Sequence, residues 1–168
     1  MFVNNTKEEN MTEYIGTKCV CARPMSKNEY ARYDGRRNEL VDVDEPGYLV
    51  EYEDGYVSWS PKGIFEDSYR SSGTMTFGDA LVLLKRGFKV ARKGWNGKGM
   101  FLFRSSAQII KFEDLKGNAA KFLNFDVTGT TVACFNQRID MKTADGSIAV
   151  GWTASQDDML ADDWMVLE

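Results

Sequence analysis

The pattern of apolar and polar positions divides the chain into stretches of different character. Residues 1–12 are polar and show no period, which predicts a disordered lead. Residues 13–70 contain alternating, strand-like segments and two short helical ones, and Asp54 followed by Gly55 predicts a hairpin turn. The order of these segments predicts an N-terminal β-α-β-β-α module, to which the sequence attaches no activity.

A second unit is predicted for residues 75–168, after a linker-like Ser-Ser-Gly segment. It begins with a helix that Thr76 caps and Gly87 ends, because apolar residues recur there at helical spacing. Strands follow, with a hairpin that turns at residues 145–146, whereas residues 105–135 fit strands or loops equally. The sequence thus predicts an α+β fold, in which a C-terminal antiparallel-sheet domain with short helices follows the N-terminal module.

The composition favours a binding protein. The formal net charge is −4, and nucleic acids and anionic membranes are held mainly by an excess of Lys and Arg, so neither is expected as a partner. No apolar run approaches the roughly 20 residues that span a bilayer, and we expect a cytoplasmic protein. The absence of histidine removes the commonest general base and the usual nucleophile systems. We therefore expect no enzyme activity and no cofactor.

The acidic segment 42–53, DVDEPGYLVEYE, has Asp, Gly and Glu residues at spacings typical of a calcium-binding EF-hand loop. Pro46 occupies the fifth position, however, and the residues after it alternate as a strand rather than entering a helix. We therefore predict no metal site. The three cysteines form neither an even disulfide framework nor paired knuckles, and they are expected to be reduced core thiols.

A tryptophan in a basic, glycine-rich turn gives the first indication of a binding site. Residues 90–103, VARKGWNGKGMFLF, place Trp95 among three glycines and three basic side chains. Glycines leave the indole open to a ligand, and Lys and Arg attract an anion. The glycine spacing does not match a phosphate-binding P-loop, so a nucleoside triphosphatase is not indicated. A solvated basic face is the alternative.

A second group of polar and aromatic residues lies in the segment 151–164, GWTASQDDMLADDW. Ser155 is expected to cap a short helix that carries four aspartates, flanked by Trp152 and Trp164. Indoles stack on bases, carboxylates accept hydrogen bonds from hydroxyls and amines, and cations hold phosphates, so the two groups together indicate a nucleotide. The aspartates also have a structural explanation, because acids in a first turn offset the helix dipole. Trp164 begins an alternating strand and is expected in the core.

Two blocks of the sequence resemble a known family. MTFGDALVLLKRGFKVARKGWNGKGMFLF (residues 75–103) and IDMKTADGSIAVGWTASQDDMLADDWMVLE (residues 139–168) strongly resemble the phage anti-Thoeris sponge proteins, the second Thoeris anti-defence family. The resemblance implies that residues 75–168 form such a sponge domain. Residues 13–70 would then be an additional phage module of unknown role.

The resemblance also implies a counter-defence function in the cytoplasm of the infected bacterium. Members of the family bind a cyclic ADP-ribose isomer, the alarm signal of Thoeris defence, without cleaving it, so that the effector is not activated. They assemble as homo-oligomers, expected here to be tetramers with pockets between protomers. Some relatives also bind cyclic oligonucleotide signals of other defence systems.

The positions that match the family's two blocks give the candidate ligand-binding residues, and none of them is expected to be catalytic or to hold a metal. We expect stacking from a tryptophan, hydrogen bonds to base or ribose from Asn96, Gln156 and Asp158, and phosphate binding by a cation of the basic segment. The candidate set comprises Trp95, Asn96, Gly97, Lys98, Trp152, Ser155, Gln156, Asp158 and Met159.

Two other classes of function fit the same residues. An enzyme could open the cyclic nucleotide with Asp158 or Asp162 as a base. A phage structural adaptor could use Trp95 as a protein-binding hot spot. Recovery of intact ligand from the complex separates a sponge from an enzyme, and absence of any ligand favours the adaptor.

Overall fold

The computed structural model describes residues 16–35, 41–95, 99–123 and 131–167 of the chain. The chain forms two compact units, Met1–Tyr69 and Arg70–Glu168, each with its own sheet and helices. The lead predicted to be disordered lies outside the described residues.

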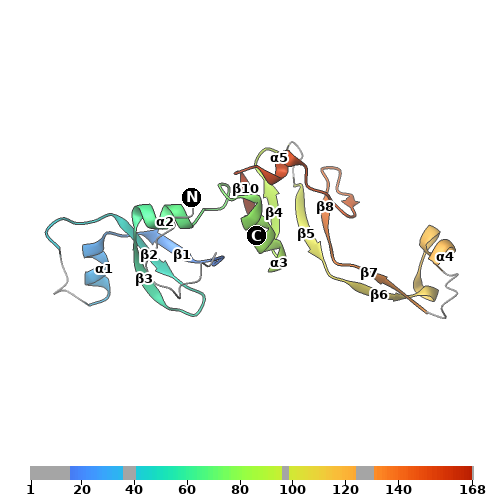
Figure 1. Cartoon of the computed structure of the whole chain (residues 1–168), viewed down its shortest axis with the longest axis horizontal. Helices are drawn as coiled ribbons and strands as arrows, with labels where there is room; N and C mark the ends of the chain where they lie inside the picture. Colours follow the sequence, from blue (N-terminus) through green and yellow to red (C-terminus); the bar gives the residue numbers. More distant parts are fainter. Residues whose placement is uncertain (1–15, 36–40, 96–98, 124–130, 168) are drawn as a thin grey trace, which may run out of the picture. The chain divides into compact units, whose positions relative to one another are not determined.

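The first unit is a three-stranded antiparallel sheet with two helices (Figure 1). β2 (Gly47–Glu51) lies between β1 (Cys21–Pro24) and β3 (Val57–Pro61). α1 (Lys27–Tyr33) follows β1, and α2 (Lys62–Ser68) follows β3. This order of elements is the β-α-β-β-α order that the sequence pattern predicts.

Side-chain contacts hold the helices and strands of the first unit together. The hydroxyl of Ser26 accepts the amide hydrogen of Glu29, and the Glu29 carboxylate accepts the amide hydrogen of Ser26, which caps α1 at its N-terminus. The indole of Trp59 donates from Nε1 to the carbonyl of Met25 at 2.8 Å. Gly47 has no side chain where the Trp59 ring passes, so the glycine lets β2 and the indole approach closely.

The second unit is built on a five-stranded antiparallel sheet with the order β10-β4-β5-β8-β9 (Figure 1). α3 (Phe77–Lys85) packs against β10, β4 and β5, and α5 (Gln156–Met159) lies next to α3. The strands are β4 (Lys89–Arg92), β5 (Phe101–Ser105), β8 (Arg138–Lys142), β9 (Ile148–Ala149) and β10 (Trp164–Leu167).

The core of the second unit lies between α3 and the sheet. Thr76 caps α3 in a reciprocal capping box with Asp79, as the sequence predicts, and Gly87 follows the helix with a φ of 91° that favours glycine. Trp164 is fully buried, which confirms its predicted place in the core. The buried cluster comprises Met75, Ala80, Leu84, Val90, Leu102, Met141 and Trp164.

β5 and β8 continue into a second, two-stranded ladder of β6 (Gln108–Lys111) and β7 (Val132–Phe135). Ser105 pairs with Arg138 and Gln108 with Phe135, so one register runs through both ladders. The short helices between β6 and β7 are η2 (Phe112–Asp114) and α4 (Gly117–Leu123) (Figure 1). Of the region that the pattern could not assign, the described part is therefore a hairpin with helical turns.

The α+β class is confirmed by these antiparallel sheets and short helices. The expectation of core thiols is wrong for Cys21 and Cys134, which are exposed, because both lie on strands whose side chains there face solvent. In the acidic segment the Asp44 carboxylate accepts the amide hydrogen of Asn28, and β2 begins at Gly47 where the alternation predicts a strand. None of the helices in the described ranges is long and apolar enough to cross a membrane.

Candidate functional site

Three tryptophans from separate parts of the second unit meet at one end of its sheet. Trp95 lies in the turn after β4, Trp152 follows β9, and Trp164 begins β10. The ring centroid of Trp95 lies 5.6 Å from that of Trp164, at an interplanar angle of 77°. It lies 6.4 Å from the ring centroid of Trp152, at an interplanar angle of 66°. These edge-to-face contacts are a preferred geometry of aromatic pairs.

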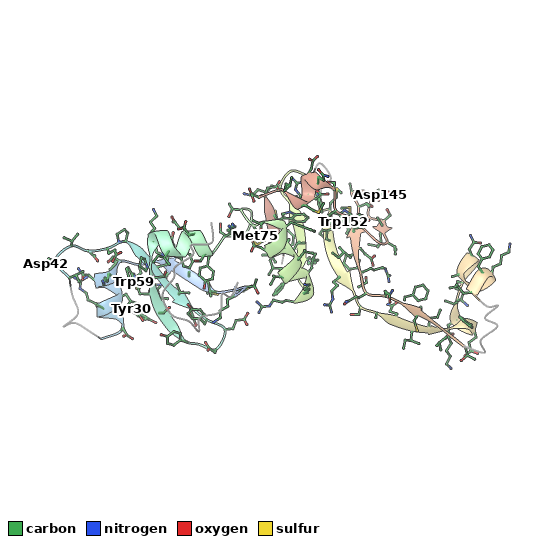
Figure 2. All side chains as sticks on the ribbon, in the orientation of Figure 1. Tyr30, Asp42, Trp59, Met75, Asp145 and Trp152 are labelled. Atoms are coloured by element: carbon green, nitrogen blue, oxygen red, sulfur yellow. The ribbon has the colours of Figure 1, made fainter. Side chains whose placement is uncertain are left out.

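Phe77, the first residue of α3, completes the aromatic cluster. Its ring centroid lies 5.4 Å from that of Trp164 and 6.3 Å from that of Trp152. Trp164 is buried at the centre, whereas Trp95 and Trp152 are each partly exposed. Figure 2 shows Trp152 at the end of the sheet where α5 lies. A ligand could therefore reach Trp95 and Trp152 but not Trp164.

A buried aspartate holds the loop that carries Trp152. Asp140 on β8 is 2% exposed, and its carboxylate accepts hydrogen bonds from the amide of Gly151 at 2.9 Å and from Nε of Arg138 at 3.1 Å. Burial raises the pKa of Asp140, but the hydrogen bonds from Ser105 and Gly151 and the charge of Arg138 outweigh it, so the pKa is lowered. The ionised carboxylate thus anchors the backbone beside Trp152.

The helix α5 presents the other candidate side chains. Ser155 caps it in a capping box with Asp158, whose carboxylate accepts hydrogen bonds from both the amide and the hydroxyl of Ser155. Gln156 is exposed, and Met159 is 48% exposed. These two side chains are accessible on the same short helix.

Arg92, at the end of β4, joins the tryptophan turn to α5. Its Nε donates to Oδ1 of Asp163 at 2.8 Å, and its NH1 donates to Oδ1 of Asp158 at 2.9 Å. The other carboxylate oxygen of Asp163 accepts the amide hydrogen of Gly94 at 3.0 Å. The indole Nε1 of Trp164 donates to the backbone carbonyl of Asp158 at 3.0 Å. One guanidinium thus connects three segments of the site.

The two carboxylates are ionised at neutral pH. The hydrogen bond from Arg92 lowers the pKa of Asp163 against the opposing effect of burial. Burial raises the pKa of Asp158, but hydrogen bonds from Ser155 and Arg92 outweigh it and the pKa is lowered. The same hydrogen bonds raise the pKa of Arg92, led by the one to Asp163. The cluster therefore remains fully charged through the physiological range.

The second unit is similar in sequence to known proteins. A family model described as the Thoeris anti-defense 2-like (Tad2-like) domain matches residues 75–167. The chain belongs to the Thoeris anti-defense 2-like family. It is 40% identical over 93 residues to a Bacillus phage SP01 protein named Thoeris anti-defense 2, an alignment that covers 55% of this chain and 94% of that protein.

Within this member of the Thoeris anti-defense 2-like family, one candidate from each sequence block meets the other in a ring contact, Trp95 with Trp152. The ion pair between Arg92 and Asp158 places the turn of Trp95 against the helix that carries Gln156 and Met159. Three of the candidates, Asn96, Gly97 and Lys98, lie outside the described residues.

Asp158 has a structural role that its motif position did not indicate. Oδ1 accepts a hydrogen bond from Arg92, and Oδ2 accepts two from Ser155, so both oxygens have partners within the chain. Phe77, Arg92 and Asp163 also belong to the site without a local signal. The helix expected to carry four aspartates ends at Met159 and carries only two of them, because Leu160 is its C-cap, so Asp163 lies outside it. The pairing of Arg92 with Asp163 is therefore a tertiary contact that no local pattern shows.

One further cation lies beside the glycine turn. Lys142 on β8 donates from Nζ to the carbonyl of Gly99 at 3.2 Å, and Gly99 has a φ of 72°. The sequence pattern placed Lys142 in a hairpin and gave it no part in binding. Its ammonium therefore lies at the C-terminal end of the glycine turn.

Proposed function

We propose that this protein binds and sequesters a cyclic ADP-ribose-type signalling nucleotide in the cytoplasm of the infected bacterium, without cleaving it, and so blocks activation of the Thoeris effector. Membership of the Thoeris anti-defense 2-like family supports a phage counter-defence role. The chemistry of the tryptophan cluster supports the kind of ligand.

The observation that carries the proposal is the meeting of two partly exposed indoles, Trp95 and Trp152, at a fixed angle of 66°. An indole face stacks on a purine, and each stacked base contributes about 1–3 kcal/mol to binding. Because buried Trp164 packs edge-on against both rings, their orientation is set before a ligand arrives. Preorganisation of this kind lowers the entropic cost of binding.

Polar side chains of the segments that carry the indoles suit the rest of such a nucleotide. Gln156 is exposed and can exchange hydrogen bonds with a base or a ribose, as can Asn96. A diphosphate needs cations, and Lys142, Lys93 and Lys98 supply them in this region of the chain. Met159, on the same helix as Gln156, offers an exposed, polarisable apolar surface.

The charged cluster favours binding over catalysis. A general base at neutral pH needs a pKa near 7, whereas the pKa values of Asp158 and Asp163 are lowered and both side chains are held by Arg92. The chain also contains no histidine. The enzymatic alternative therefore depends on Asp162, or on a rearrangement that frees Asp158.

The proposal is tested by titrating the protein with a cyclic ADP-ribose isomer in a calorimeter and then examining the released nucleotide by chromatography. Tight binding with intact nucleotide is expected. A linear product would identify an enzyme. Absence of binding to a cyclic ADP-ribose isomer, and of any nucleotide after incubation with lysate of infected Thoeris cells, would favour the structural adaptor.

The proposal also includes assembly as a homo-oligomer, a tetramer with pockets between protomers, and binding of cyclic oligonucleotides by the same protein. Exposed apolar side chains of the second unit, among them Ile109 at 74% and Phe122 at 67%, are consistent with contacts between copies. Light scattering of the purified protein gives the stoichiometry, and competition between the two kinds of ligand shows whether their sites are separate.

A further inference from the structure

We infer that Arg92 is a positioning residue of the proposed nucleotide site: it fixes the tryptophan turn to α5 and leaves phosphate binding to lysines. This inference rests on the function proposed above and assigns a role within the same site. It is carried by three hydrogen bonds, two made by the guanidinium and one made by the Gly94 amide to the same Asp163 carboxylate.

The Arg92 guanidinium already binds two carboxylates. Its Nε and NH1 point to two different carboxylates at 2.8 and 2.9 Å, and its side chain is only 19% exposed. The partner side chains of Asp158 and Asp163 are 14% and 30% exposed. A guanidinium held in this way by two anions offers little charge to a third, because the carboxylates neutralise it locally.

The guanidinium connects the tryptophan turn with α5. Asp163 bonds the backbone of Gly94, directly before Trp95, and Asp158 is the third helical residue of α5. Through Arg92 the turn and the helix therefore share one charged junction. The two carboxylates lie 66 and 71 residues from Arg92 along the chain, so the bonds join distant segments rather than neighbours.

This charged junction depends on the planar geometry of the guanidinium. A guanidinium has several N–H donors fixed in one plane, which lets it bind two carboxylates in defined directions at once. A lysine ammonium keeps the charge but is a point donor on a flexible stem, so it cannot reproduce both bonds in the same arrangement. The conservative replacement therefore separates geometry from charge.

The experiment compares wild-type protein with Arg92→Lys by calorimetric titration with a cyclic ADP-ribose isomer. A positioning role predicts affinity weaker by about tenfold in the folded variant, since coupling within one charged network is of that order. The matched control is Arg70→Lys, which alters an exposed ion pair with Asp79 at 3.9 Å in the same unit and should leave affinity unchanged.

A second variant, Arg92→Gln, removes the charge and is titrated at low and high salt. Positioning predicts weaker binding with a salt dependence like that of the wild type, because the lysine contacts to phosphate persist. If Arg92→Lys binds normally while Arg92→Gln binds weakly with reduced salt dependence, Arg92 contacts phosphate and the inference is overturned. Normal binding by both folded variants would reduce Arg92 to a stabilising role and also overturn it.

A third measurement keeps the inference separate from the proposed function. If the wild type does not bind the nucleotide, the proposed function fails, but the junction is still tested by hydrogen exchange. Faster exchange at residues 93–95 in Arg92→Lys than in Arg70→Lys is expected, because the Gly94 amide is bonded to Asp163. Equal exchange in the two variants would show that Arg92 does not hold the turn.

Discussion

The two units of the chain both pack aromatic side chains on a small antiparallel sheet, but they pack them differently. In the first unit Phe65 stacks with Tyr48 at 4.2 Å and 22°, and with Tyr69 at 4.9 Å and 27°. In the second unit the indoles meet at angles of 66° to 81°. Stacked rings cover one another's faces, whereas edge-on rings leave faces that a flat ligand can contact.

The difference extends to the bonds around the rings. The first-unit rings come from β2, α2 and the residue after α2, which are close in sequence, and the Tyr48 hydroxyl donates to Glu66 at 2.8 Å. The rings of the second unit come from distant segments, fixed by Arg92 and Asp140. The two units therefore differ in how the orientation of their rings is fixed: by stacking within a short segment in the first unit, and by charged side chains from distant strands and loops in the second.

The largest effect is expected for Trp164→Ala, at the centre of the second unit. The change removes a fully buried indole, its contacts with three other rings and its bond to the Asp158 carbonyl. Truncation of a buried Trp lowers the free energy of unfolding by about 3–5 kcal/mol. Calorimetry should show a lower transition for the second unit and an unchanged one for the first. A joint shift of both transitions would show that the units are not independent.

In the first unit the corresponding change is Gly47→Ala. A Cβ there would overlap the Trp59 ring and the backbone of Ser60, which cannot move without breaking the pairing of β2 with β3. Overpacking of this kind costs about 1–3 kcal/mol of unfolding free energy. Gly63→Ala in α2 is the control, because nothing lies within 4 Å of its Cβ position. Chemical denaturation should show a lower free energy of unfolding for Gly47→Ala than for Gly63→Ala. Equal stability of the two variants would contradict the packing account.

Trp95→Ala tests the edge-on cluster as a binding surface. Loss of a stacking platform should weaken binding of a cyclic ADP-ribose isomer by about 1–3 kcal/mol, with a smaller loss of stability than for Trp164→Ala because Trp95 is partly exposed. Tyr56→Ala in the first unit, 63% exposed, is the control and should bind normally. A Trp95 variant that melts as early as the Trp164 variant and still binds when folded would remove Trp95 from the site.

Much of this fold could be predicted, because its signals are local. The capping boxes at Thr76 and Ser155 and the turn at Gly146 lie within a few residues of the patterns that predict them. The ladder of β6 and β7 could not be assigned, because its exposed Ile109 and buried Ala133 interrupt the alternation of polar and apolar positions.

The site was predictable only in part. The glycine turn and the motif around Trp152 identify two segments, and the fold brings them together. The packing of Trp95 against Trp164 could not be predicted, since an indole among glycines favours exposure. The pairing of Arg92 with Asp158 and Asp163 also depends on the tertiary fold. Asp158 had an adequate local explanation in the helix dipole, and no local pattern linked Asp163 to Arg92.

The units should also respond to opposite extremes of pH. In the second unit the pKa values of Asp140, Asp158 and Asp163 are lowered, so their stabilising effect is present above 3.8, the unfolded value, and is lost as pH falls through the folded values. In the first unit one exposed carboxyl group, Asp44, also has a lowered pKa, through the hydrogen bond from the Asn28 amide. The pKa values of Tyr48 and Tyr69 in that unit are raised, so their contribution is lost as pH rises beyond 10.0. Calorimetry across pH should therefore show the second unit weakening first in acid and the first unit in alkali. The reverse order would contradict these assignments.

The smallest effect is expected where the two units join. A fragment of residues 70–168 should fold alone and bind a cyclic ADP-ribose isomer as well as the whole chain does, because the second unit contains its own core and the whole tryptophan cluster. A fragment that begins at Met75 loses the bond from the Gly73 amide to the Trp164 carbonyl at 2.9 Å and the bonds between Ser72 and Val166. Since a hydrogen bond contributes about 0.5–1.5 kcal/mol net, and these are partly solvated, the shorter fragment should be less stable by about 1 kcal/mol.

Thermal unfolding of the two fragments measures their stability, and titration of each with a cyclic ADP-ribose isomer measures its affinity. Equal affinity with slightly different stability would show that the first unit contributes nothing to the tryptophan site. If the longer fragment folded but bound more weakly than the whole chain, residues of the first unit would belong to the site.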